Sequence, residues 1–236
     1  MTPSTVAERL ADNLQSIQRR IARACEQAGR DPAEVTLLAV SKYRPIEHVR
    51  TLYDLGLREF AESRVQDGRD RIPDLPSGIR WHLIGRLQTN KAKYLPGLFH
   101  TVHSVDRPDV AEALNKAYAK QGEMAEVYAQ INISGEDQKA GVSAADAAAF
   151  VRDVASRESL RLAGLMTMAP YVDDPEEVRP VFRQLRELRD RLQDESGLAL
   201  PALSMGMTGD FEVAIEEGAT IVRVGTALFD TGEADR

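Results

Sequence analysis

The feature that most constrains the fold is an alternation of short β-rich runs with longer segments whose apolar residues have helical spacing. The β-rich runs occupy residues 35–41, 58–62, 80–85, 101–105, 126–133, 162–168, 202–206 and 220–225. Such alternation is typical of βα units on a parallel sheet, and eight units close a barrel. We therefore predict an α/β fold, a (β/α)8 barrel of the TIM type. An open, doubly wound sheet is the alternative, because alternation alone does not prove closure.

An amphipathic segment precedes the first strand, with apolar residues at steps of three and four: Val6, Leu10, Leu14, Ile17, Ile21 and Cys25. Thr2 before Pro3 suits the start of this helix, and Gly29 suits its end. Little chain follows Gly225, so the last strand has no full helix of its own and we expect the first helix to pack in that gap. The prediction is one domain over residues 1–236, with an extra helix in 1–30 and the barrel in 35–229.

Composition excludes several functional classes. The formal net charge of -7 and the pI near 5.3 argue against a nucleic-acid binder, which needs an excess of Lys and Arg. Cys25 is the only cysteine, which excludes an internal disulfide and favours a reducing compartment. The sequence shows neither a signal peptide nor a run of membrane-spanning length, so we predict a cytoplasmic protein that binds no membrane. The histidines lack metal-ligand spacing, and we predict no metal.

Lys42 is the first candidate for chemistry. It ends the apolar run 37–40, and the carboxyl ends of the strands form the functional face of a parallel barrel. The turns after the last two strands, 204–210 and 223–226, carry glycines and hydroxyl side chains that suit a phosphate. A solvated lysine and ordinary βα turns are the alternatives. Together the three segments indicate a phosphorylated carbonyl ligand.

A lysine beside a phosphate site suggests a Schiff base, in which a neutral amine attacks an aldehyde. Burial at the barrel mouth and a nearby cation would both favour the neutral amine. Arg223 could be that cation, although an arginine at a strand end is also commonly a phosphate clamp or an ion-pair partner.

Several motifs in their expected order resemble the pyridoxal phosphate homeostasis proteins, short relatives of the amino-terminal barrel of alanine racemase. They are residues 37–42 (LLAVSK), 81–85 (WHLIG), 87–91 (LQTNK), 130–133 (QINI), 139–141 (KAG), 164–166 (GLM), 204–207 (SMGM) and 222–225 (VRVG).

The resemblance implies that pyridoxal 5'-phosphate is bound covalently as an internal aldimine on Lys42. Ser204, Gly206, Arg223, Gly225 and Thr226 then lie in segments that surround the cofactor. Ser204, Gly225 and Thr226 are expected to contact the phosphate. Arg223 is expected to face the pyridine nitrogen, which a permanent cation would keep unprotonated, so that the ring would be a weak electron sink.

The chain departs from the family pattern after the second strand. The family usually reads Phe-Gly-Glu-Asn-Tyr, whereas Ala61, Ser63 and Arg64 stand here at the second, fourth and fifth positions. Ser63 stays a cofactor-binding candidate, although its hydroxyl is shorter than the asparagine amide. His82 is included as a residue that flanks the cofactor or supports the barrel, with catalysis as the alternative.

The resemblance implies a protein that carries or buffers the cofactor for apo-enzymes without substantial turnover of its own. We expect a monomer, because the second domain of related racemases is missing. Related racemases add a second domain with a tyrosine, and two-base racemisation needs groups on both faces of the carbon. The alternative is a pyridoxal-dependent racemase or lyase that uses Lys42 with His82, Tyr43 or Tyr171. A third possibility is a Schiff-base aldolase without any cofactor.

Overall fold

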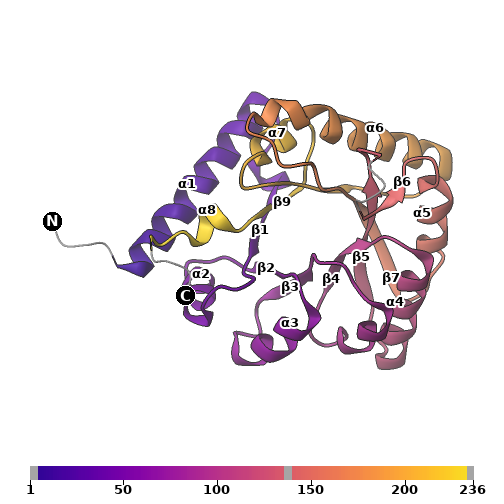
Figure 1. Ribbon diagram of the computed structural model, residues 1–236, viewed down its shortest axis with the longest axis horizontal. Helices are drawn as coiled ribbons and strands as arrows, with labels where there is room; N and C mark the ends of the chain where they lie inside the picture. The colour runs from indigo at the N-terminus through magenta and orange to yellow at the C-terminus, as the bar shows by residue number, and fades with distance from the viewer. Residues whose placement is uncertain (1–4, 136–139, 233–236) are drawn as a thin grey trace.

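A closed parallel barrel forms the centre of the computed structural model, which describes residues 5–135 and 140–232 (Figure 1). The eight barrel strands pair in parallel with their neighbours in chain order, and both the β4–β5 and the β1–β9 pairings are present, so these strands form a closed ring. The barrel strands are β1 (Thr36–Val40), β2 (Glu59–Glu62), β3 (Arg80–Leu83), β4 (Thr101–Val105), β5 (Ala125–Asn132), β7 (Leu160–Met166), β8 (Ala202–Met207) and β9 (Ile221–Val224). The predicted barrel is confirmed, and the open sheet is excluded.

All eight predicted strands are present, and their ends differ by no more than two residues from the predicted ones. The largest shift is in β7, which runs from Leu160 to Met166 rather than over 162–168. The short strand β6 (Val142–Ser143) pairs with β5 and was not predicted. Two residues are too few to show the period-two alternation that identifies a strand.

Helices surround the barrel and cover the outer faces of its strands. The α-helices are α1 (Val6–Gln27), α2 (Ile46–Asp54), α3 (Val65–Arg71), α4 (Pro108–Gln121), α5 (Ala147–Ala155), α6 (Arg179–Ser196), α7 (Phe211–Glu216) and α8 (Thr226–Phe229). The described residues also form four 3-10 helices: η1 (Pro32–Glu34), η2 (Ile72–Asp74), η3 (Thr89–Tyr94) and η4 (Pro175–Val178). No helix in the described ranges has the length and apolar character needed to cross a membrane.

The first helix begins with a capping box at Thr5. The Thr5 hydroxyl accepts from the Glu8 backbone N–H, and the Glu8 carboxylate accepts from that of Thr5, which satisfies two N–H groups that the helix leaves open. The predicted start at Thr2 and Pro3 lies outside the described residues. The predicted apolar stripe is buried from Leu10 to Cys25.

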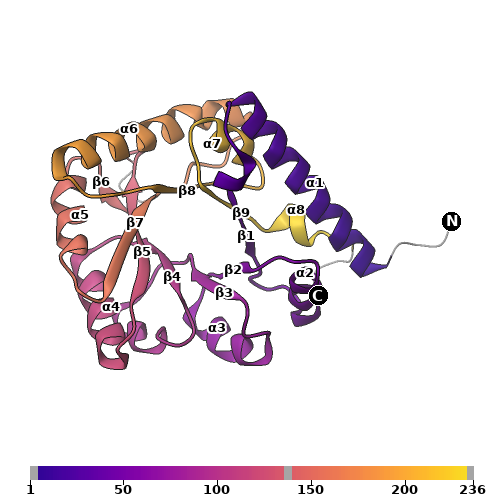
Figure 2. The same ribbon diagram turned by 180° about the vertical axis from the view of Figure 1, so that it is seen from behind.

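Helix α1 packs against α2, α7 and α8 (Figure 2). The last of these has only four residues, so the barrel wall beside β9 would be thinly covered without α1. The Asn13 side-chain amide donates to the carbonyls of Leu228 (3.2 Å) and Asp230 (2.7 Å) and ties the two ends of the chain together. Helix α1 therefore lies beside the short helix that follows the last strand.

The strands divide the core into two clusters because successive side chains point to opposite faces. In β1, Leu37 and Ala39 belong to the large cluster between the barrel and its helices, whereas Leu38 and Val40 face inward. The inner cluster is small: Leu38, Val40, Ala61, Tyr128, Ala163, Met166 and Ile221. Apolar side chains thus fill only part of the interior.

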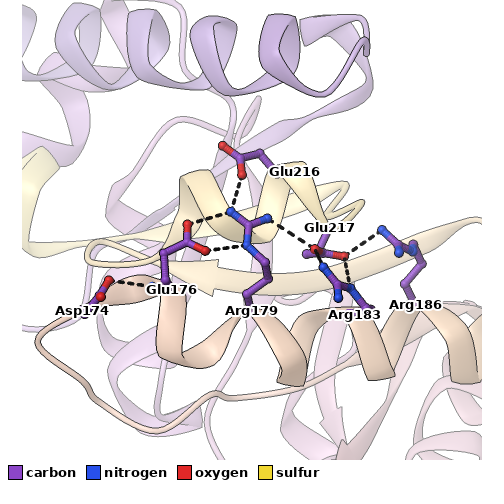
Figure 3. A network of polar contacts seen from close by, with 7 residues as sticks. All are labelled: Asp174, Glu176, Arg179, Arg183, Arg186, Glu216 and Glu217. Atoms are coloured by element: carbon purple, nitrogen blue, oxygen red, sulfur yellow. Dashed lines mark hydrogen bonds and ion pairs between the residues drawn. The ribbon is translucent and has the colours of Figure 1, made fainter.

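An ion-pair network joins α6 to the end of α7 (Figure 3). The Glu217 carboxylate, 5% exposed, forms ion pairs with Arg179 (3.3 Å), Arg183 (2.9 Å) and Arg186 (2.9 Å). Arg179 also pairs with Glu176 and Glu216. Burial alone would disfavour the Glu217 carboxylate, but its hydrogen bonds from the arginines outweigh burial and lower its pKa. The network fixes α7, which follows directly on the loop after β8.

Candidate functional site

A cavity of about 540 Å³ opens at the carboxyl ends of the strands. This volume lies in the usual range for small-molecule sites. Its described lining comes from the loops after β1, β2, β3, β5, β7, β8 and β9. Five predicted site residues line it together: Lys42, Ser63, Arg223, Gly225 and Thr226.

Lys42 lies in a tight turn directly after β1. The Arg44 N–H donates to the Ser41 carbonyl (3.0 Å) and closes the turn. Tyr43 has φ 63°, a left-handed conformation that costs a non-glycine residue about 1 kcal/mol. Lys42 itself is exposed rather than buried, so the burial that would favour a neutral amine is absent from its own position. The turn places Lys42 in the lining of the cavity.

Arg71 on α3 clamps this turn. Its guanidinium donates to the Ser41 carbonyl (3.0 Å), to the Arg44 carbonyl and to Glu62 Oε1 (2.8 Å). The Ser41 hydroxyl also donates to Glu62 Oε1 (2.8 Å). Glu62 is fully buried, and burial raises its pKa against the effect of Arg71 and of the Ser41 hydrogen bond. The backbone on either side of Lys42 is thus fixed by groups that sequence analysis did not single out.

Arg223 points inward from β9 and forms part of the cavity wall at the barrel interior. Its guanidinium donates to the Ser204 carbonyl (2.9 Å), to Ser204 Oγ (2.8 Å) and to the Thr167 carbonyl (3.0 Å). Burial lowers the pKa of Arg223 to about 10, opposed by the charge of Asp210. Because this value is still well above neutral pH, the buried guanidinium stays a cation.

The turns after β8 and β9 close the other side of the cavity. Asp210 Oδ1 accepts from the Met207 N–H (2.6 Å), and the Asp210 N–H donates to the Met207 carbonyl (3.1 Å), which fixes residues 207–210. Burial raises the pKa of Asp210. At Gly225 a Cβ atom would lie 3.3 Å from the Val40 carbonyl oxygen, so a small residue lets this turn approach β1. Thr208, Gly209, Gly225 and Thr226 all line the cavity.

Three predicted site residues do not line the cavity. Ser204 is fully buried, and its hydroxyl contacts Arg223 and His103. Gly206 has φ +95°, and a Cβ there would lie 2.7 Å from Ala214, so its glycine is required by packing against α7. His82 is 3% exposed and lies in the barrel interior. Ser204 and His82 therefore reach the site only through other side chains.

Gln130 is a lining residue that sequence analysis did not select as a candidate. Its side-chain amide donates to the Ala140 carbonyl (3.2 Å), and both residues line the cavity. Its inward position in β5, two residues after Tyr128 of the inner cluster, is the signal that could have identified it. Lys139, which precedes Ala140 in the motif 139–141, lies outside the described residues.

The cavity is electropositive in an acidic protein. Its described lining contains four basic residues, Lys42, Arg44, Arg86 and Arg223, and Asp210 as its single acidic one, while the chain carries a net charge of -7. A local excess of cations in a concave site favours an anionic ligand. Within residues 5–135 and 140–232, no group of His, Cys, Asp and Glu side chains could hold a metal ion.

The closed barrel with a lysine directly after β1 can be assigned to a class of protein by comparing the sequence with known families. The family model described as alanine racemase, N-terminal domain, matches residues 12–231, which include every barrel strand. The class is therefore the alanine-racemase type of barrel.

Relatives narrow this class. A pyridoxal phosphate homeostasis protein of Aquifex aeolicus is 46% identical over 219 residues, which cover 92% of this chain and 96% of that protein. One from Pseudomonas aeruginosa is 41% identical over 223 residues, covering 93% and 94%. PipY of Synechococcus elongatus, solved with PLP bound, is 35% identical with a TM-score of 0.81, covering 95% of this chain and 100% of PipY. The chain belongs to the pyridoxal phosphate homeostasis protein family.

Proposed function

We propose that the protein binds pyridoxal 5'-phosphate in the 540 Å³ cavity and holds it as a Schiff base on Lys42. One observation carries this proposal: a single cavity is lined by a primary amine, a buried guanidinium and two glycine-containing turns. These are the groups that an aldehyde, an aromatic nitrogen and a phosphate require. The bound cofactor would supply the aldehyde, and the chain supplies the amine and the shape of the site.

The turns after β8 and β9 are the best candidates for the phosphate. Gly225 and Thr226 begin α8, where backbone N–H groups are still open, and the Thr226 hydroxyl adds a donor. Thr208 and Gly209 line the cavity beside them. Ser204 was also expected to contact the phosphate, but its hydroxyl is buried against Arg223 and His103. We therefore propose that Ser204 acts through Arg223 instead.

Arg223 is the group that would decide what the cofactor can do. The family resemblance puts an arginine at the pyridine nitrogen, and Arg223 lines the cavity from inside the barrel. A guanidinium at that nitrogen keeps it unprotonated and weakens the ring as an electron sink. Such a site retains the cofactor but supports carbanion chemistry poorly.

We infer from this that the protein carries or buffers pyridoxal phosphate and passes it to apo-enzymes, as the names of its relatives suggest for them. A cytoplasmic monomer is the form that we propose for this role. Mixing the loaded protein with a pyridoxal-dependent apo-enzyme should restore that enzyme's activity, and recovery no faster than with the same concentration of free cofactor would contradict delivery by contact.

The test of the site is borohydride reduction followed by peptide mass spectrometry. Reduction should remove the yellow imine absorbance and leave the mass of reduced pyridoxal phosphate on the peptide that contains Lys42. Lys42→Ala should show no adduct while its stability stays within about 0.5 kcal/mol, because the side chain is exposed. An adduct on another lysine, or none in a protein incubated with the cofactor, would refute the proposal.

A pyridoxal-dependent racemase or lyase is the second candidate, because Tyr43 and Tyr171 line the same cavity as Lys42. Both tyrosines are largely exposed, at 68% and 92%. His82, the other base considered, does not line the cavity. Incubation of the loaded protein with amino acids in deuterated water separates the two functions: rapid exchange of the α-proton would favour the enzyme, and exchange at the rate of free cofactor would favour the carrier.

A further inference from the structure

A row of polar side chains crosses the interior of the barrel and ends at the cavity. Each distance in the row is that of a good hydrogen bond. They are Glu59 Oε2 to His82 Nε2 (2.6 Å), His82 Nδ1 to His103 Nε2 (2.8 Å), His103 Nδ1 to Ser204 Oγ (2.8 Å) and Ser204 Oγ to Arg223 Nη1 (2.8 Å). The five residues come from β2, β3, β4, β8 and β9, so the row connects opposite walls of the barrel.

The two ends of the row carry opposite charges. Burial opposes ionisation of Glu59, but the hydrogen bond from His82 and the charge of Arg80 lower the Glu59 pKa, so this end is a carboxylate. Its side chain is 26% exposed and pairs with Arg80 (3.5 Å), which lines a second cavity, of about 280 Å³. Arg223 at the other end is a buried cation. Between the ends, His82, His103 and Ser204 are at most 3% exposed.

The charged groups at the two ends of the row, Glu59 and Arg223, determine which of the neighbouring atoms donates a hydrogen and which accepts one. A guanidinium has donors only, so Ser204 Oγ accepts from Arg223. A carboxylate only accepts, so His82 Nε2 carries the hydrogen that Glu59 receives. Burial, reinforced by the charge of the Arg223 guanidinium, lowers the pKa of His103 well below its usual value. His103 is therefore neutral and has a single N–H.

One arrangement of the remaining hydrogens satisfies every group. The Ser204 hydroxyl donates to His103 Nδ1, and His103 Nε2–H donates to His82 Nδ1. In the reverse arrangement His103 would donate to Ser204, and His82 would have to be a cation that donates at both nitrogens. The Ser204 hydrogen would then have no acceptor, since among the described residues its oxygen contacts only His103 and Arg223. A buried hydroxyl without an acceptor is costly, so the first arrangement is favoured.

We propose that Glu59, His82, His103 and Ser204 form a directed hydrogen-bond chain that fixes the Arg223 guanidinium at the wall of the cavity. Every donor in the chain points toward Glu59, so the Ser204 oxygen always offers its lone pairs to Arg223. Glu59, His82 and His103 are then positioning residues, although none of them lines the cavity. The effect on the cofactor rests on the proposed function, while the direction of the chain does not.

The surroundings of the chain support a positional role. Interiors of such barrels are usually filled by layers of branched apolar side chains, and burying polar groups there costs free energy unless all are paired. The Tyr128 ring stacks on the His103 ring, with centroids 4.5 Å apart and planes at 9°. This contact holds the imidazole in the plane that lets its two nitrogens reach His82 and Ser204.

Ring-nitrogen NMR of the protein without cofactor tests the direction of the chain. The chain has four histidines, which single His→Gln variants assign one at a time. Near pH 7.5, His82 and His103 should both be neutral with the hydrogen on Nε2. A hydrogen on Nδ1 of either ring, or an imidazolium at His82, would overturn the proposal, and this measurement needs no bound cofactor.

Titration with pyridoxal phosphate tests the link to the cavity. Glu59→Gln removes the charge at the far end of the chain and should weaken binding about threefold or more, as coupling through a packed network typically does. The matched control is Glu123→Gln, which lines the second cavity with Arg80 and accepts only from the Gly97 N–H (2.9 Å) among its described hydrogen bonds. It should bind like the unmodified protein.

The outcomes separate the two proposals. Equal binding by Glu59→Gln and the unmodified protein, or an equal loss in both variants, would overturn the positional role. Should Glu59→Gln fail to fold, Ser204→Ala replaces it in the same titration, with a loss of binding expected and unchanged binding overturning the role. An unmodified protein that forms no imine would refute the proposed function alone, because the NMR result still decides the direction of the chain.

Discussion

Arg223 combines two roles at the scale of single residues. It is a cation at the cavity and also the donor to the Ser204 and Thr167 carbonyls. A buried carbonyl that loses its donor costs about 1 to 3 kcal/mol. Substitution of Arg223 is therefore expected to change both ligand binding and stability.

For Arg223→Ala we expect pyridoxal phosphate to bind at least about tenfold more weakly and the free energy of unfolding to fall by about 1 to 3 kcal/mol. Arg223→Lys keeps a charge but not the fork of donors, and should lie between Ala and the unmodified protein. Titration followed by imine absorbance measures the affinity for pyridoxal phosphate, and urea denaturation measures the free energy of unfolding. Binding and absorbance unchanged in Arg223→Ala would count against its proximity to the cofactor.

Arg71 is expected to act on the lysine without touching the cofactor. Arg71→Met removes the donors that hold the Ser41 and Arg44 carbonyls, so the turn at Lys42 should lose its fixed geometry. We expect imine formation with added pyridoxal phosphate to slow or weaken by about threefold to tenfold, the effect of about 1 kcal/mol of lost positioning. Stopped-flow absorbance measures it.

Arg69→Met is the control for that substitution. Arg69 lies on the same helix, and its guanidinium stacks on the Tyr94 ring away from the turn. Its imine formation should match that of the unmodified protein. An equal effect of both substitutions would show that α3 as a whole, rather than the Arg71 clamp, is responsible.

At the scale of elements, sequence analysis predicted the strands well because the barrel strands are short β-rich runs, such as the apolar residues 37–40, that alternate with helical segments. Sequence analysis also selected Lys42, Ser63, Arg223, Gly225 and Thr226, which all line one cavity. It could do so because the loops after parallel strands meet at one end of a barrel. What it missed depends on distant pairings. His103 meets Ser204 across 101 residues, and Arg71 on a helix with two basic residues in its last turn resembles an ordinary surface side chain.

The α6–α7 network gives a prediction with a definite pH dependence. Because the pKa of Glu217 is lowered in the folded protein, its stabilisation is complete above the unfolded value of about 4.5 and is lost as the pH falls through the lower folded value. Glu217→Gln should cost about 1 to 2 kcal/mol at pH 7, since the partner arginines are partly exposed.

Urea denaturation of both proteins between pH 3 and pH 7 measures this cost. The difference should be constant above about pH 5.5 and should shrink below about pH 4.5. The control is Glu195→Gln, an exposed residue on α6, the helix that carries the partner arginines, and no such difference is expected for it. A constant difference over the whole range would contradict the ionic origin.

At the scale of the whole molecule, α1 covers the part of the barrel wall where α8 is short. Ile17 is 2% exposed at the centre of its buried stripe. Ile17→Ala should lower the free energy of unfolding by about 2 to 4 kcal/mol, as large-to-small core substitutions do. Gln18→Ala, on the exposed side of the same turn, should change it by less than about 0.5 kcal/mol. Equal stability of the two variants in urea would contradict the packing role of α1.

The bonds from Asn13 to residues 228 and 230 join groups that are 215 and 217 positions apart. During synthesis the first helix leaves the ribosome long before the surface that receives it has been translated. Its apolar stripe must stay exposed, or be shielded by other factors, until α7 and α8 have emerged. Translation of this late segment, rather than formation of any early one, is therefore the event that allows the barrel to be sealed.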